Sequence, residues 1–203
     1  MEWQLTPENY LSKEEVQKLT VLMRNAKDLA MYRGGSKADV KDYYIVQTFL
    51  FTGLRLAELI DLNIEDLYIK RQRPCILVRK GKGGKQRTVF LSQDGKTLLQ
   101  ELLDLKLQWN EPEYGTLFLS TRNTPYTSRA IQLRIKDWYH KAGLDYKKLT
   151  VHSLRHTYLT ELLRSTKNLN LVKNQAGHSS LLTSSVYLHL VSDDLESLEK
   201  LYS

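Results

Sequence analysis

The sequence predicts a mainly α-helical domain of the α+β class, with one small β-hairpin or sheet. Three observations support this fold class. Apolar residues recur at helical spacing along most of the 203 residues, several of these segments lie between capping residues and glycines, and one region places two β-rich segments around a glycine-rich turn. With 41% apolar residues, the chain can also form a real hydrophobic core.

The N-terminal quarter predicts two helices. Ser12 and Glu15 match a capping box, in which a hydroxyl and a carboxylate satisfy the free amides of a first helical turn. The apolar face of the helix that follows consists of Val16, Leu19 and Met23. After the break at Gly34-Gly35-Ser36, a second helix is expected from about Asp39 to Phe51, stopping at Gly53. Its late part is apolar nearly all round, which is typical of a buried helix.

The segment Leu54–Leu59 predicts a helical turn that carries Arg55 and Glu58. Residues three apart share a helix face, so these two side chains point the same way. An arginine this close to apolar neighbours needs a partner. Two interpretations therefore stay open, a structural Arg55–Glu58 ion pair and a functional arginine.

Residues 70 to 87 predict a basic β-hairpin. Cys75–Arg79 and Thr88–Leu91 are β-rich and flank a turn at Gly81–Gly84, where glycine allows close approach to a ligand. The segment holds eight basic and no acidic residues: Lys70, Arg71, Arg73, Arg79, Lys80, Lys82, Lys85 and Arg87. Such a loop is either simply solvated or bound to nucleic acid. Like charges repel unless a polyanion neutralises them, and the net charge of +7 also favours an anionic partner, so we expect DNA or RNA contact.

The middle of the chain predicts a leucine-rich core helix from about Ser92 to Trp109, ended near Pro112. A short strand is expected at Thr116–Leu119. The apolar residues of the next helix, which Thr127 or Ser128 caps and Gly143 closes, are Ile131, Ile135 and Trp138. Its exposed face offers Arg129, Arg134, Lys136 and Lys141. This face is either a helix along phosphates or an ordinary solvated surface.

The helix that opens at Val151 carries a predicted anion site. His152 and Arg155 share a face near its N-terminus, where free amides and side-chain donors converge. The histidines of the last part of the chain, His152, His156, His178 and His189, also raise the question of a metal. Their spacing fits no zinc pattern, and we expect no metal site.

The C-terminal part predicts two short helices and an acidic tail. One helix covers about Leu169–Ala176 and stops at Gly177, and the next carries Tyr187, nine residues after His178. Tyr187 alone is compatible with simple packing, because a phenol titrating near ~10 needs cations and proton acceptors around it to react. The tail from Ser192 places Leu195, Leu198 and Leu201 on one stripe among acidic residues.

Composition excludes several protein classes. The single cysteine, Cys75, rules out an internal disulfide and is typical of a reducing compartment. The chain opens without a basic leader and apolar segment, and no apolar run approaches the roughly 20 residues of a membrane span. We therefore expect a soluble, cytoplasmic protein with no membrane partner.

Five motifs stand in order along the chain. They are Thr52-Gly53-Leu54-Arg55-Leu56-Ala57-Glu58-Leu59, the Gly81–Arg87 turn, His152-Ser153-Leu154-Arg155-His156, Gly177-His178-Ser179-Ser180 and Tyr187. Together, from about residue 8 to 190, they resemble the tyrosine recombinase family, the phage integrase and Xer-type site-specific DNA recombinases. The resemblance implies that family's catalytic-domain fold. It also implies a DNA breaking-rejoining reaction, in which the tyrosine oxygen joins the 3′ phosphate at a DNA break.

The resemblance also implies roles for single residues. Arg55 and Arg155 would hold the scissile phosphate, Lys82 would be the hairpin lysine, and His152 and His178 would complete the pocket around the nucleophile Tyr187. Lys85 competes with Lys82, which we prefer because it lies between glycines. Glu58 would support the pocket without reacting. The residues expected to contact DNA are Arg79, Lys80, Lys85, Arg87, Arg129 and Arg134. No cofactor or metal is required, since two guanidiniums can meet the phosphate charge.

One departure from the family concerns domains. Most members carry an N-terminal DNA-clamping domain, whereas here only about fifty residues precede Arg55. We therefore expect residues 1–11 to be a linker remnant, 12–190 the catalytic domain, and the clamping domain to be absent. The resemblance further implies that the tail, 191–203, packs on a neighbouring subunit of a homotetramer on synapsed double-stranded DNA. The alternatives are a type IB topoisomerase-like enzyme and a non-catalytic DNA-binding module of the same fold.

Overall fold

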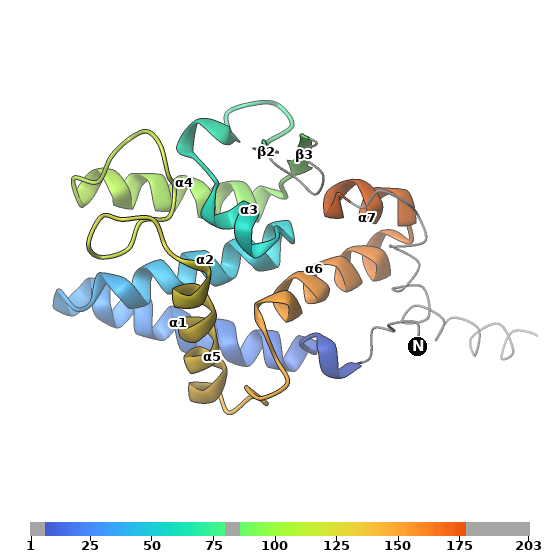
Figure 1. The fold of residues 1–203 in the computed structure, drawn as a ribbon, viewed down its shortest axis with the longest axis horizontal. Helices are drawn as coiled ribbons and strands as arrows, with labels where there is room; N and C mark the ends of the chain where they lie inside the picture. The colour runs from blue at the N-terminus through green and yellow to red at the C-terminus, as the bar shows by residue number, and fades with distance from the viewer. Residues whose placement is uncertain (1–6, 80–85, 178–203) are drawn as a thin grey trace, which may run out of the picture.

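The computed structural model describes residues 7–79 and 86–177. The helices are α1 (Lys13–Arg33), α2 (Lys37–Thr52), α3 (Leu56–Ile60), α4 (Gln93–Gln108), α5 (Ser128–Lys141), α6 (Val151–Thr166) and α7 (Leu169–Ala176). Two 3₁₀ turns, Pro7–Asn9 and Ile64–Asp66, and the strands β1 (Leu67–Tyr68), β2 (Cys75–Val78) and β3 (Arg87–Phe90) complete the elements. The predicted class, mainly α with a small sheet, is confirmed (Figure 1).

Local capping fixes where the first two helices begin. The predicted capping box of α1 is present: the Glu15 backbone N–H donates to Ser12 Oγ at 3.2 Å, and the Ser12 N–H donates to the Glu15 carboxylate at 2.8 Å. Helix α2 begins at Lys37, slightly earlier than expected, because the Ser36 hydroxyl accepts from the Ala38 N–H at 3.2 Å.

Helix α2 is the centre of the domain. It packs against α1, α4 and α6, and every residue from Val40 to Phe49 is buried. The prediction of a helix that is apolar nearly all round, and therefore buried, is confirmed. The helix ends at Gly53, whose φ of 59° lies in the left-handed region that favours glycine. The chain then turns sharply into α3.

The sheet has three strands rather than the two of the predicted hairpin. Its order is β1-β2-β3, and both pairs are antiparallel. The β2–β3 hairpin is confirmed, whereas β1 was not predicted. The strand expected at Thr116–Leu119 is wrong: this segment makes only two isolated bridges, Asn63 with Thr116 and Leu119 with Pro125. Such single bridges anchor a loop but do not extend a sheet.

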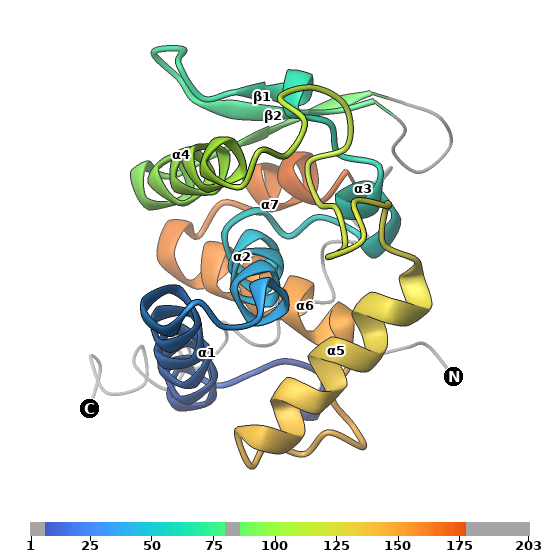
Figure 2. The same ribbon diagram turned by 90° about the vertical axis from the view of Figure 1, so that its left-hand side faces the viewer.

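The sheet lies on one side of the molecule, and α4 and α7 separate it from α2 (Figure 2). Helix α7 contacts both β3 and α6. The link between α2 and α3 lies close to the C-terminal end of α7, since Arg155 bonds the carbonyls of both Gly53 and Ala176. This junction of α3, α7, β3 and the start of α6 holds Arg55, Glu58, His152 and Arg155, the predicted catalytic and supporting residues that the structure describes.

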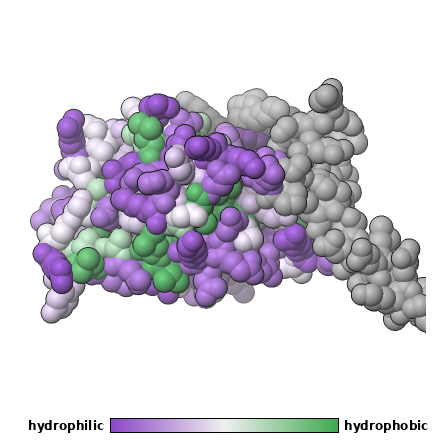
Figure 3. Space-filling view, turned by 90° about the horizontal axis from the view of Figure 1, so that it is seen from below, coloured by the Kyte–Doolittle hydropathy of each residue, from purple (hydrophilic) through white to green (hydrophobic). Residues whose placement is uncertain are grey.

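Residues before α1 are packed onto the domain. Tyr10 and Leu11 are buried, and the Leu11 N–H donates to Thr157 Oγ1 at 2.9 Å. Among the helices of the described residues, none is long and apolar enough to cross a membrane. The face seen in Figure 3 is mainly hydrophilic, with hydrophobic residues in small separate patches.

Candidate active site

Arg55 is placed by the first turn of α3. It is the N-cap residue, with extended backbone, and Glu58 reaches back to accept its N–H at 2.8 Å. The side chains also pair, since Arg55 NH1 donates to Glu58 Oε1 at 2.8 Å. The structural ion pair is therefore present. Arg55 remains accessible to a ligand despite this pair, because its side chain is 25% exposed, whereas that of Glu58 is 3% exposed.

Arg155 joins the C-terminal ends of two helices. It lies in the first turns of α6, is only 5% exposed, and donates through NH1 to the carbonyl of Gly53 and through NH2 to that of Ala176 at 2.8 Å. Carbonyls at a helix C-terminus carry partial negative charge and lack intrahelical partners. Arg155 satisfies one at the end of α2 and one at the end of α7.

The two predicted arginines converge at the end of α7. Arg55 NH2 lies 3.4 Å from the carbonyl oxygen of Gly177, the residue after the Ala176 carbonyl that Arg155 binds. Gly177 ends α7 with a φ of 63°, so the predicted glycine stop is confirmed. Two guanidiniums from distant parts of the chain thus lie beside the residue that precedes His178.

His152 lies near the same cluster in the first turn of α6, where part of its surface is exposed and the rest is packed against the protein. Desolvation, with the positive charges of Arg155 and Arg55 nearby, lowers the pKa of His152. An imidazole with a lowered pKa is neutral near pH 7 and can accept a proton. Its helix neighbour His156 is more buried, and burial together with Arg155 and His152 lowers its pKa to about 4.

Glu58 is shared by a second arginine, which sequence reasoning did not assign to the site. Arg87 of β3 donates to both carboxylate oxygens of Glu58, at 2.6 and 2.8 Å. Burial raises the pKa of Glu58, but the hydrogen bonds from Arg87 and Arg55 outweigh it and lower that pKa to about 2. Glu58 is therefore an anion held between two guanidiniums.

The other residues expected to contact DNA differ in their surroundings. Arg79 is half exposed and bonds the buried carboxylate of Asp66 at 2.5 Å. Arg129 is exposed and makes no ion pair within residues 7–79 and 86–177. Arg134 binds both carboxylate oxygens of the buried Asp42, at 2.5 and 2.6 Å. Arg87 and Arg134 thus already have bidentate carboxylate partners within the protein.

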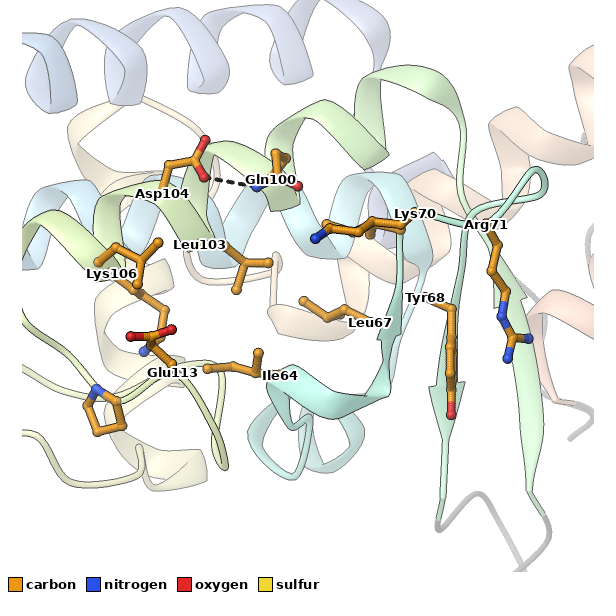
Figure 4. A pocket seen from close by; sticks show the side chains of 13 residues that line it. Ile64, Leu67, Tyr68, Lys70, Arg71, Gln100, Leu103, Asp104, Lys106 and Glu113 are labelled. Atoms are coloured by element: carbon orange, nitrogen blue, oxygen red, sulfur yellow. Dashed lines mark hydrogen bonds between the residues drawn. The ribbon is translucent and has the colours of Figure 1, made fainter.

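Several predicted site residues lie outside the described residues, namely Lys80, Lys82, Lys85, His178 and Tyr187. In the part of the chain that is described, no group of three His, Cys, Asp or Glu side chains lies close enough together to hold a metal ion. A pocket of about 490 Å³ between β1 and α4, with Leu67 and Leu103 in its wall, contains none of the predicted site residues (Figure 4).

Solved structures define the class of this fold. The chain matches the crystal structure of XerA recombinase with a TM-score of 0.72 and 29% identity, covering 96% of this chain and 63% of that one. It matches XerH site-specific recombinase, bound to its difH substrate in a post-cleavage complex, with a TM-score of 0.75 and 27% identity, covering 97% and 54%. The catalytic domain of bacteriophage HP1 integrase has the same fold, with a TM-score of 0.61. The fold is that of tyrosine recombinase catalytic domains.

The chain belongs to the phage integrase family, whose model matches residues 9–193. Among its relatives is the tyrosine recombinase XerC of Haemophilus ducreyi, 36% identical over 165 residues, which are 81% of this chain and 52% of the relative. Another is the XerC of Lactobacillus delbrueckii subsp. bulgaricus, 37% identical over 159 residues, 77% of this chain and 52% of the relative. The chain spans about half the length of these curated relatives.

Proposed function

We propose that this chain is the DNA-cleaving part of a site-specific recombinase, which breaks and rejoins DNA through a covalent 3′-phosphotyrosine intermediate. One observation carries the proposal: Arg55 and Arg155, one hundred positions apart, converge on the carbonyls of Ala176, the last residue of α7, and Gly177, directly before His178. Membership of the phage integrase family supports it.

The arginines suit the charge that develops at the phosphate. In-line displacement at a phosphodiester accumulates negative charge on the non-bridging oxygens, and guanidinium groups meet that charge without a metal. In our proposal Arg55 and Arg155 hold the scissile phosphate. Their intramolecular bonds to Glu58 and to the helix ends orient them before DNA binds, so little reorganisation is needed.

Proton transfer completes the reaction. The Tyr187 oxygen attacks phosphorus and forms the new P–O bond, while its proton passes to His152, whose lowered pKa keeps it neutral and able to accept. The bond from phosphorus to the 5′ oxygen breaks, and Lys82 supplies the proton to that leaving oxygen. His178 donates a hydrogen bond to the phosphate. A 5′ hydroxyl from a second strand reverses these steps, so rejoining needs no ATP.

Double-stranded DNA is the proposed partner. The Tn1549 transposon integrase, whose fold matches with a TM-score of 0.72, was solved in complex with transposon right end DNA. Backbone contacts are assigned to Arg79, Lys80 and Lys85 on the hairpin and to Arg129 on α5. Of these, the described residues Arg79 and Arg129 are half exposed and exposed. Arg87 and Arg134 are given a different role, because each binds both oxygens of a buried carboxylate and is less exposed than Arg79, at 11% and 34% against 52%.

The acidic tail, 191–203, is proposed to dock on a neighbouring copy in a homotetramer. A pocket of about 610 Å³ between α1, α2 and α6 supports this idea, with Leu11, Leu50 and Phe51 in its wall and basic side chains around it. Those basic residues are Lys13, Arg24 and Arg164. The leucine stripe and acidic charge of the tail complement such a surface. Truncation after Val191 should alter cleavage in the assembled complex, whereas unchanged cleavage would reject the docking role.

The proposed chemistry is tested by trapping the intermediate on a nicked suicide DNA substrate. Wild type should form a covalent protein–DNA adduct, and Tyr187→Phe should form none. An adduct that persists in Tyr187→Phe would reject the nucleophile. A wild type that binds DNA but never forms an adduct would support a binding module, and plasmid relaxation without exchange between sites would support a topoisomerase.

A further inference from the structure

We propose that Arg87 is a positioning residue that orients Arg55 through Glu58, and not a phosphate contact. The inference rests on the proposed function and concerns the same site. It starts from the carboxylate of Glu58, which accepts four hydrogen bonds. Oε1 accepts from Arg55 NH1 at 2.8 Å and Arg87 NH1 at 2.6 Å, and Oε2 accepts from the Arg55 N–H and Arg87 NH2, both at 2.8 Å.

The two arginines that share Glu58 differ in what they offer to a ligand. The side chain of Arg87 is 11% exposed, and it uses all three guanidinium nitrogens in hydrogen bonds, the third from Nε to the Gln175 carbonyl at 3.2 Å. Arg55 is 25% exposed, and its bond from NH2 to Gly177 is long, at 3.4 Å. Of the two arginines that share Glu58, Arg55 is therefore the one with a weakly bonded nitrogen to offer a phosphate, whereas every guanidinium nitrogen of Arg87 is bonded within the protein and Arg87 holds Glu58 in place.

Arg87 is in turn fixed by the end of α7. A Cβ placed on Gly177 would lie only 2.7 Å from Arg87 Cδ and 2.8 Å from Nε, so the guanidinium packs directly on the glycine backbone. The side-chain amide of Gln175 adds a second link: it donates to the Phe90 carbonyl and accepts from the Phe90 N–H, both at 3.0 Å. Gln175 is 4% exposed, so this amide pair is shielded from water.

These contacts connect three elements that meet at the site. Strand β3 contributes Arg87, and α3 with its N-cap contributes Glu58 and Arg55. At the end of α7, the carbonyl of Gln175 accepts from Arg87 and that of Gly177 from Arg55. Removing Arg87 would leave Glu58 with a single guanidinium and free Arg55 to move, while the guanidinium of Arg55 itself is retained. A displacement of about 1 Å of such a group can reduce a reaction rate about 100-fold.

The test compares wild type with Arg87→Met, Arg55→Met and a control, Arg33→Met, an exposed arginine at the end of α1. Single-turnover adduct formation is measured on suicide DNA with a normal scissile phosphate. It is then measured on the same DNA with a methylphosphonate there, which removes the charge that Arg55 must meet. We expect Arg87→Met to form the adduct about 10- to 100-fold more slowly than wild type on the phosphate DNA, with a much smaller loss of rate on the methylphosphonate DNA. Arg55→Met should show the same pattern. Arg33→Met should match wild type on both.

Binding measurements separate the remaining roles. The slope of log K against log salt should be unchanged by Arg87→Met, because no phosphate contact is lost. A salt slope lower by about one phosphate contact would overturn the inference. So would a rate of adduct formation that falls equally on both DNAs, or that does not fall at all. If Arg87→Met fails to fold, Arg87→Lys carries the comparison, since it keeps the charge but not the bidentate geometry. Wild type without any adduct would overturn the proposed function and this inference with it.

Discussion

The carboxylate of Glu58 lies between the guanidiniums of Arg55 and Arg87 and accepts hydrogen bonds from both, at 2.6 to 2.8 Å. Glu58 is buried and its pKa is lowered to about 2, so it is an anion at neutral and mildly acidic pH. Removing one partner of a buried ion pair leaves an uncompensated charge, so Glu58 is held in place and orients the arginine that remains open to a ligand.

Glu58→Gln should lower the stability of the protein in a pH-dependent way. The pKa of Glu58 is about 2 in the folded protein against 4.5 for an unperturbed glutamate. A depressed carboxyl pKa stabilises the fold fully above the unfolded value and less as the pH falls toward the folded one. Urea unfolding should show a deficit of about 3 kcal/mol at pH 7 that shrinks below about pH 4.5. A deficit that is constant from pH 7 to 3 would contradict the ionic role.

Cleavage should keep its rate down to a lower pH than an ordinary histidine base would allow. Desolvation and the charges of Arg155 and Arg55 lower the pKa of His152. The rate should therefore be flat through about 6.5, the usual histidine value, and fall only below it. His152→Gln should slow single-turnover adduct formation about 100-fold or more, and its rate should no longer fall with pH in this acidic range. If the rate of His152→Gln fell with pH as that of wild type does, the titrating group would be another residue.

Gly177→Ala should be more destabilising than Gly34→Ala. Both glycines have a φ of 63°, so each alanine strains the backbone to the same degree. Only at Gly177 would the new Cβ also displace the Arg87 guanidinium, since nothing lies within 4 Å of a Cβ at Gly34. We expect Gly34→Ala to lower the free energy of unfolding by about 1 kcal/mol, and Gly177→Ala to lower it by at least twice as much, in thermal or urea unfolding. Equal losses would show that Arg87 moves aside freely.

Arg129→Ala should weaken DNA binding without affecting stability. Arg129 is exposed at the start of α5 and has no ion pair within the described residues. If it contacts a phosphate, its loss should reduce the salt dependence of binding by about one contact. Arg33→Ala, at the far end of α1, is the control and should leave the slope unchanged. A slope that Arg129→Ala also leaves unchanged would remove α5 from the interface.

Local signals in the sequence predicted most of the helices. The capping box at Ser12, the glycine stops at Gly53 and Gly177 and the apolar all-round pattern of α2 are encoded within one or two turns, and all are present. The predicted start of α2 is about two residues late. Ser36, the last residue of the predicted break Gly34-Gly35-Ser36, caps the helix through its hydroxyl. Strand β1 has only two residues, too few to show alternation.

Long-range pairing was the part that the sequence could not reveal. Arg87 and Glu58 are 29 positions apart, and Gln175 and Phe90 are 85 apart, so no local pattern connects them. The charge run of the hairpin suggested a DNA contact for Arg87, because a sequence shows the charge but not the buried carboxylate that binds it. The same holds for Arg134, which was also expected to contact DNA and instead binds the buried carboxylate of Asp42, 92 positions away. By contrast, the convergence of Arg55 and Arg155 was implied by the resemblance to the tyrosine recombinase family.

The central claim is tested most directly by trapping the protein on a suicide DNA substrate that carries its recombination site. Wild type should become covalently joined to the 3′ phosphate, with or without EDTA, because the proposed chemistry uses guanidiniums and no metal. Tyr187→Phe should bind the same DNA and form no adduct. Adduct formation by Tyr187→Phe, or cleavage that stops in EDTA, would contradict the account.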